Sequence, residues 1–169
     1  KGNVFCATGV TEQGQGTEAV IAQIVATSVG VPMENVRVVT GDTEVTPYGG
    51  GTWASRGCGI AGEAAAQAGH VLRDNILDVA GIMLQTESTG LDIQNGKIVD
   101  ADDGTERTTL DEVARVAYYR PDTFPEDFQS ELMVTRHYVP RDYPFAFTNG
   151  VQASYLEVDI ETGFIRLLK

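Results

Sequence analysis

Two glycine-rich stretches, each ahead of an amphipathic helix pattern, constrain the fold of this chain more than any other feature. The first, "TEQGQGTEAVIAQIVATSVGVP", puts Gly14-Gln15-Gly16 at a helix start, and the second, "TPYGGGTWASRGCG", precedes a longer helix pattern. Glycine loses more conformational entropy on folding than any other residue, so glycine pairs at a helix start require a reason. Close approach of the backbone to another element or to a ligand would be such a reason.

The hydrophobic spacing around these stretches predicts alternating strands and helices. β-branched runs predict strands over about residues 4–8 and 36–39. Apolar residues at three- and four-residue spacing predict helices over about residues 17–29 and 61–83, and Gly30 provides a stop for the first. The glycine-rich stretches are therefore expected to be loops that lead from strands into helices.

The second half of the chain adds a hairpin, a short helix and further strands. Asn95-Gly96 in "LDIQNGKIVD" favours a type I′ turn, and Thr109 with Glu112 forms a capping box ahead of a helix of roughly two turns. "LMVTRHYV" and "NGVQASYLEVDIETGFIRLL" alternate as strands do. This order predicts an α+β fold, a two-layer domain with a mixed sheet and a few helices, and residues 1–169 are expected to form a single domain.

The net charge and the patterns at the two ends of the sequence indicate which partners to expect and whether the chain is part of a longer protein. Twelve basic and twenty-four acidic residues give a net charge of −12, which argues against nucleic acid or an anionic membrane as the main partner. No apolar run approaches the ~20 residues of a membrane-spanning helix, so we expect no span and a cytoplasmic location. The chain begins in a strand pattern and stops within a hairpin, so we expect it to be part of a longer polypeptide.

Several mechanisms could explain the first glycine pair. A Walker-type phosphate loop is excluded because "GVTEQGQGTE" contains no lysine. A dinucleotide fingerprint matches loosely, but the first glycine does not follow the strand directly. Two glycine loops could instead hold one elongated anionic cofactor through backbone N–H groups and helix dipoles, with Thr52, Ser55 and Arg56 adding polar contacts. The alternative is that both loops are only tight connections.

At these residues the sequence resembles the large, cofactor-binding subunit of the molybdenum hydroxylases, the family of xanthine dehydrogenase, aldehyde oxidase and aerobic carbon monoxide dehydrogenase. The resemblance runs through "TGVTEQGQGTEAVIAQIVATSVGVPMENVRVVTGDTEVTPYGGGTWASRGCGIAGEA" and resumes in "YPFAFTNGVQASYLEVDIETG". The least characteristic part is residues 88–122. Both motifs in this order and separation are more specific than either glycine loop alone. The implied fold is that of a molybdenum cofactor-binding domain.

The resemblance implies where a cofactor would lie. Gln15 would lie near molybdenum without being a direct ligand, and Arg56 matches a position associated with the cytosine-dinucleotide form of molybdopterin. The backbone beside Gln15 would lie against the pterin. The complete set of implied cofactor-binding residues is Gly14, Gln15, Gly16, Thr52, Trp53, Ala54, Ser55 and Arg56.

The implied reaction is hydroxylation of an aldehyde or heterocycle, or oxidation of carbon monoxide, with water as the oxygen source. The implied cofactor is molybdopterin cytosine dinucleotide with molybdenum, and FAD and 2Fe-2S clusters would lie on partner subunits or domains. The family's general base is a glutamate in a later Gly-Glu segment, so Glu63 is not assigned this role and no catalytic residue is expected in this chain. The chain alone is therefore expected to be inactive, and its implied partners are the rest of the large subunit, the iron–sulfur and flavin subunits and a small-molecule substrate.

Two other functions remain open from the sequence. One is a non-catalytic scaffold domain that keeps the fold without the cofactor, and the other is a nucleotide-dependent dehydrogenase. The remaining candidate metal or redox residues have no ligand spacing: we expect Cys6 and Cys58 to be buried thiols, and His70 and His137 to be structural.

Overall fold

The computed structural model describes residues 2–142 and 149–169. Its regular elements are β1 (Val4–Ala7), α1 (Thr17–Val29), β2 (Val36–Val39), α2 (Glu63–Leu84), β3 (Leu91–Gln94), β4 (Lys97–Asp100), β5 (Glu106–Thr109), α3 (Leu110–Tyr119), β6 (Leu156–Val158) and β7 (Ile165–Leu167). Short helical turns lie at Met33–Asn35, Gly57–Gly62, Ser88–Gly90 and Pro121–Thr123. In the described part of the chain, no helix has the length and apolar character needed to cross a bilayer.

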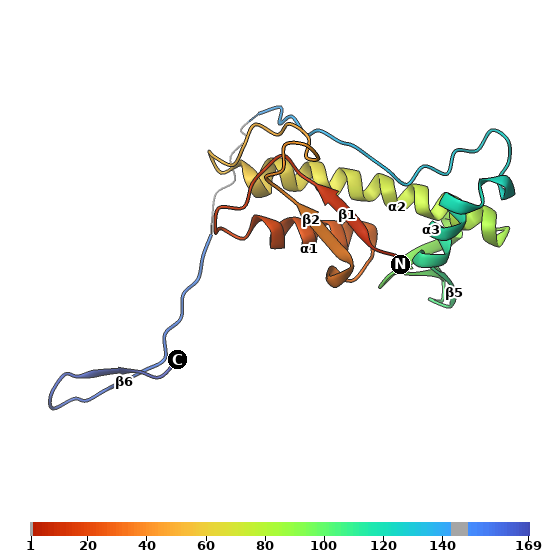
Figure 1. Cartoon of the computed structure of the whole chain (residues 1–169). Helices are drawn as coiled ribbons and strands as arrows, with labels where there is room; N and C mark the ends of the chain where they lie inside the picture. The colour runs from red at the N-terminus through yellow and green to blue at the C-terminus, as the bar shows by residue number, and fades with distance from the viewer. Residues whose placement is uncertain (1, 143–148) are drawn as a thin grey trace.

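Helices α1 and α2 pack against each other and begin at the same end of the body (Figure 1). Their crossing is close, because a methyl group on Gly69 of α2 would lie 1.9 Å from Ser28 Oγ of α1. Ile21 and Val29 of α1 and Val79 of α2 are among the most deeply buried side chains. The hydrophobic core therefore sits between the two helices and the strands that cover them.

The described strands form three small sheets rather than one mixed sheet. β1 and β2 pair in parallel, β3, β4 and β5 form an antiparallel sheet, and β6 pairs with β7 in a separate hairpin. Parallel pairing of β1 and β2 requires the crossover that α1 provides. The α+β class predicted from the sequence is confirmed.

Local sequence signals predicted the element ends well. Gly30 ends α1 with φ of 93°, and its N–H donates to the Ala26 carbonyl. Asn95 and Gly96 both have positive φ, 51° and 75°, as a type I′ turn requires. Thr109 Oγ1 accepts a hydrogen bond from the Glu112 N–H over 3.3 Å, which confirms the cap of α3. These signals act within one turn and need no tertiary partner.

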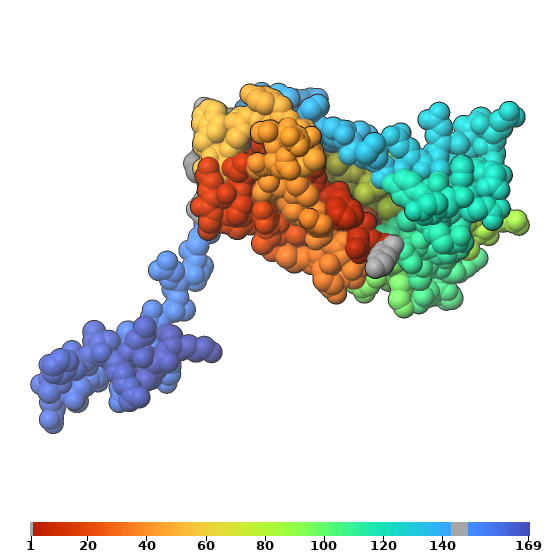
Figure 2. All heavy atoms as spheres, in the orientation of Figure 1, coloured from red at the N-terminus to blue at the C-terminus, as the bar shows by residue number. Residues whose placement is uncertain are grey.

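Longer-range expectations were less accurate. Residues 132–139, predicted as a strand, form none and run as an extended segment over the α2 side of the molecule (Figure 2). Within 149–169, only β6 and β7 are strands, and this hairpin stands away from the body with every residue exposed (Figure 1). Residues 143–148, which open the second stretch of the family resemblance, lie outside the described residues.

Candidate cofactor site

The two glycine-rich loops contact each other directly. We define the first glycine loop as residues 9–16 and the second as residues 46–59. A methyl group on Gly9 would lie 2.4 Å from the Gly49 nitrogen, so only glycine permits this backbone approach. Further along, the Thr11 N–H donates to Thr52 Oγ1 over 2.6 Å, and Thr52 Oγ1 donates to the Thr11 carbonyl over 2.9 Å. The structure therefore joins the two motifs into one site.

The first glycine loop folds around the carboxylate of Glu12. Glu12 Oε1 accepts hydrogen bonds from the N–H groups of Gly14 (2.8 Å) and Gly16 (2.9 Å), and Oε2 accepts from the Glu18 N–H (3.0 Å). The Glu18 bond is the first cause that lowers the pKa of Glu12, followed by the bond from Gly16. The N–H groups at the start of α1, which we expected to face a ligand, are thus bonded to an anionic side chain.

Backbone conformation accounts for glycine at positions 14 and 16. Gly14 has φ of 93° and Gly16, the residue before α1, has φ of 83°. A methyl group at either position would meet no other described atom within 4 Å. The left-handed backbone is therefore what favours glycine here, and open space faces both residues.

The side chain of Gln15 lies within the first glycine loop and is exposed. Its Nε2 donates to the Thr11 carbonyl (3.2 Å) and to Thr17 Oγ1 (2.6 Å), while its Oε1 accepts from the Gln13 N–H (2.7 Å). Both amide hydrogens are used, and one lone pair of Oε1 remains. In this conformation Gln15 can accept a further hydrogen bond from a ligand but cannot donate one.

The second glycine loop carries a cation beside an aromatic ring. The Arg56 guanidinium carbon lies 4.8 Å from the centroid of the Trp53 ring, and Trp53 Nε1 donates to the Gly50 carbonyl over 2.7 Å. No carboxylate of the described residues forms an ion pair with Arg56. The loop therefore presents an available positive charge, which suits an anionic group.

Strained backbone leads from this loop into α2. Ala54 and Ser55 both have positive φ, 52° and 56°, which is unfavourable for residues with a side chain. The chain then enters a π-helical turn, Gly57–Gly62, before α2 begins. Such outliers are concentrated at functional sites, so the geometry supports a ligand-binding role for this loop.

A cavity of about 890 Å³ opens beside the second glycine loop. Gly49, Gly50 and Arg56 line it, together with β1, the small residues at the start of α2 and the extended segment 132–139. Its volume is within the range of small-molecule and cofactor pockets. Gln15 and Trp53 are not among the lining residues, so the cavity holds only one side of the predicted site.

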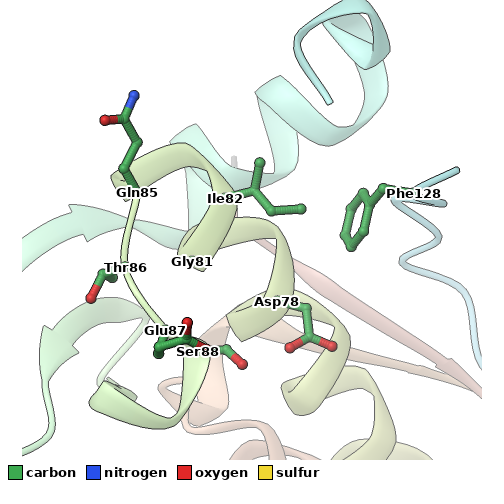
Figure 3. Close-up of a pocket in the computed structure, with 8 residues that line it drawn as sticks. All are labelled: Asp78, Gly81, Ile82, Gln85, Thr86, Glu87, Ser88 and Phe128. Atoms are coloured by element: carbon green, nitrogen blue, oxygen red, sulfur yellow. The ribbon is translucent and has the colours of Figure 1, made fainter. Parts of the chain in front are cut away.

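A second hollow, of about 690 Å³, lies at the other end of α2 (Figure 3). Ile82 and Phe128 lie on one side of it, and Asp78 and Glu87 bring two carboxylates without a basic residue. The C-terminal end of a helix also carries a partial negative charge. This hollow is therefore unsuited to an anionic cofactor, unlike the cavity beside Arg56.

The other candidate residues lie on different elements: Glu63 and His70 on α2, Cys6 on β1, His137 in the segment 132–139, and Cys58 within the second glycine loop. Glu63 is exposed and accepts a hydrogen bond from Gln67 Nε2 over 2.9 Å, in the first turn of α2. His70 and His137 are exposed, and the described residues contain no cluster of metal-ligating side chains. The expectation of two buried thiols is wrong for Cys58, which lies in the π-helical turn and is exposed, while Cys6 is half-buried.

Comparisons with known proteins show the family of this chain. The model of the molybdopterin cofactor-binding domain matches residues 1–169. The chain is 31% identical to the carbon monoxide dehydrogenase large chain of Hydrogenophaga pseudoflava, over 96% of this chain and 20% of that protein. It is 30% identical to the nicotine 6-hydroxylase large subunit of Paenarthrobacter nicotinovorans, over 99% of this chain and 20% of that protein.

A solved structure gives the same result for the fold. The crystal structure of quinoline 2-oxidoreductase from Pseudomonas putida 86 superimposes with a TM-score of 0.70 and 28% sequence identity. The match covers 94% of this chain and 20% of that chain. The chain thus spans about a fifth of the length of these relatives.

Proposed function

Because the chain belongs to the molybdopterin cofactor-binding domains of molybdenum hydroxylase large subunits, we propose that its two glycine loops together hold one molybdenum cofactor. The observation that carries this proposal is the pair of hydrogen bonds between Thr11 and Thr52, which ties both loops into one site. The proposed binding residues are those that the resemblance implies: Gly14, Gln15, Gly16, Thr52, Trp53, Ala54, Ser55 and Arg56.

The charges of the two loops support one orientation of the cofactor. Glu12 places a carboxylate at the start of α1, and Arg56 places an available cation in the second glycine loop. An anionic pyrophosphate is repelled by the first and attracted by the second. The proposed orientation therefore has the phosphate end at Arg56 and the metal end facing Gln15. The cytosine dinucleotide form is proposed on the resemblance at Arg56 alone.

The residues present fit such an elongated, anionic ligand. The cavity beside Arg56 combines apolar walls with a cation, and Gly14 and Gly16 of the first loop face open space. When bound, the molybdenum cofactor supplies the redox chemistry. The chain's own contribution is to orient the cofactor through Gln15 and Arg56.

The complete protein is proposed to be an oxidoreductase that hydroxylates an aldehyde or a heterocycle, or oxidises carbon monoxide, with water as oxygen source. The names of these relatives cover two of the three substrate types, carbon monoxide on one side and the heterocycles nicotine and quinoline on the other. The general base, the 2Fe-2S clusters and FAD are proposed to lie on the rest of the large subunit and on partner subunits. Residues 1–169 would form one cytoplasmic domain without activity of its own.

The first test is the cofactor content of the full-length protein, purified with its partners from its native host. We expect molybdenum near one atom per large subunit and acid-released cytidine monophosphate. Both absent, from a host that loads other such enzymes, would overturn the proposal and favour a scaffold without cofactor. NAD in place of a pterin would instead indicate a nucleotide-dependent dehydrogenase.

A matched pair of variants tests the contact that joins the loops. Thr52→Val removes the hydroxyl that bonds Thr11, whereas Thr52→Ser keeps it. We expect the valine variant to lose most of its molybdenum and the serine variant to retain it. Equal molybdenum content in both folded variants would contradict the role of this contact in cofactor binding.

A further inference from the structure

The carboxylate of Glu12 is the one charged group that organises the first glycine loop, and the family resemblance gives it no role. Glu12 uses both oxygens: Oε1 accepts from the Gly14 and Gly16 N–H groups, and Oε2 accepts from the Glu18 N–H. Gly16, the residue before α1, has no side chain that could cap the helix. Glu12 replaces this missing cap from four residues upstream.

These bonds also fix the surroundings of Gln15. Gly14 and Gly16 flank Gln15, and both adopt positive φ angles that an unrestrained glycine has no need to keep. With the neighbouring N–H groups held by Glu12, the Gln15 amide is placed to bond Thr11 and Thr17 and to leave one Oε1 lone pair open. The loop is therefore ordered by its own side chains before a ligand binds.

We propose that Glu12 is a positioning residue, whose carboxylate holds the Gly14–Gly16 backbone in the conformation that receives the cofactor. The effect on cofactor binding rests on the proposed function, but the hydrogen bonds between Glu12 and the loop can be measured without the cofactor. A loop that is ordered before the cofactor binds lowers the entropic cost of binding. Loss of the hydrogen bonds to Glu12 therefore weakens cofactor retention.

The discriminating variant is Glu12→Gln in the full-length complex. Glutamine offers one acceptor oxygen, so it can serve either the two glycine N–H groups or the Glu18 N–H, but not both. Glu34→Gln is the matched control, because Glu34 is an exposed glutamate in another helical first turn, remote in sequence from the glycine loops. Hydrogen exchange at residue resolution measures directly how well the amides bonded to Glu12 are protected. The amide of Ile98 in the β3–β4–β5 sheet is the fold control.

In Glu12→Gln we expect exchange at Gly14 and Gly16, or at Glu18, to become about tenfold faster, with Ile98 unchanged. Molybdenum per folded large subunit should fall several-fold, while Glu34→Gln matches the wild type in both measurements. Should Glu12→Gln fold poorly, the rate of molybdenum release from Glu12→Asp, whose shorter side chain cannot reach all three N–H groups, provides the second readout.

Two results would overturn the proposal. Unchanged exchange at all three amides would show that Glu12 does not hold the loop. Faster exchange with wild-type molybdenum content and release would show that this conformation is not required for the cofactor. A wild-type complex that contains no molybdenum would instead refute the proposed function, while the exchange measurement would still report whether Glu12 orders the loop.

Discussion

At the scale of single residues, the candidate site is determined by hydrogen bonds that sequence reasoning could predict only in part. The importance of the glycines and of Gln15 was evident from the motif, but Glu12 was missed. A lone acidic residue ahead of two glycines is typical of a solvated loop. In the structure its three N–H partners lie two, four and six residues downstream. An acid four residues before a glycine that starts a helix is the signal that could have identified it.

Gln15, a proposed cofactor-binding residue, and Glu63, which is assigned no role, are both exposed and provide a direct contrast. In the full-length enzyme we expect Gln15→Ala to lower turnover by about tenfold or more, because it removes a polar contact proposed to lie near the metal end. Glu63→Ala should change turnover little, since among the described residues the exposed Glu63 carboxylate is hydrogen-bonded to Gln67 alone. Both variants are assayed at equal molybdenum content, and comparable losses would contradict the assignment.

The charge of Glu12 makes the first glycine loop sensitive to acid. Its pKa is lowered in the folded chain, first by the Glu18 N–H and then by the Gly16 N–H. A lowered folded pKa means that the stabilisation is fully present above the unfolded pKa, near 4.5, and is lost as pH falls through the folded value. We expect wild type to be more stable than Glu12→Gln above about pH 5, and the two to converge in acid.

The measurement is the free energy of unfolding of both chains by urea between about pH 3 and 7. A difference that stays constant over this range would show that ionisation of Glu12 does not stabilise the loop. Glu34→Gln serves as the control, and no comparable convergence is expected for it.

At the scale of elements, helices and tight turns were predictable, whereas strand pairing was not. Gly30, Asn95-Gly96 and Thr109 act through local backbone geometry, and the structure confirms each. Alternation in residues 132–139 suggested a strand, but a strand requires hydrogen bonds from a neighbouring edge, which the sequence pattern does not specify. The π-helical turn at Gly57–Gly62 has no short sequence signature, so the sequence did not predict it.

The crossing of α1 and α2 gives a prediction at this scale. In Gly69→Ala the new methyl group would lie 1.9 Å from Ser28 Oγ and 2.8 Å from Ser28 Cβ, so the helices must separate. We expect a loss of about 1–3 kcal/mol in the free energy of unfolding. Gly90→Ala is the matched control, because its methyl group would meet no described atom within 4 Å, and a change above about 0.5 kcal/mol there would argue against this explanation.

At the scale of the whole molecule, the hydrophobic core and the proposed cofactor site share the same pair of helices. The core lies along α1 and α2, and both glycine loops lie where these helices begin (Figure 1). The β6–β7 hairpin pairs Leu156 with Leu167 and Val158 with Ile165, and all four side chains are exposed. The hairpin thus adds no buried apolar area to the core.

This separation predicts the result of a truncation. A chain that ends at residue 150 should unfold with the same free energy as the 169-residue chain, because every residue of 151–169 is exposed. Urea unfolding followed by tryptophan fluorescence is the measurement, since Trp53 lies in the second glycine loop. A loss of more than about 1 kcal/mol would show that the hairpin packs on the body in solution.

The contact between Gly69 and Ser28 also determines which parts of this domain can change during evolution. It sets the spacing of the two helix axes, and therefore the distance between the loops at their ends, from a point well inside the body. The exposed residues 41–43, which follow β2 and do not line the cavity beside Arg56, take no part in that spacing and can vary in length at little energetic cost. Divergence among proteins with this fold should therefore be concentrated in such connections, while the width of the proposed cofactor site is inherited with the helix crossing.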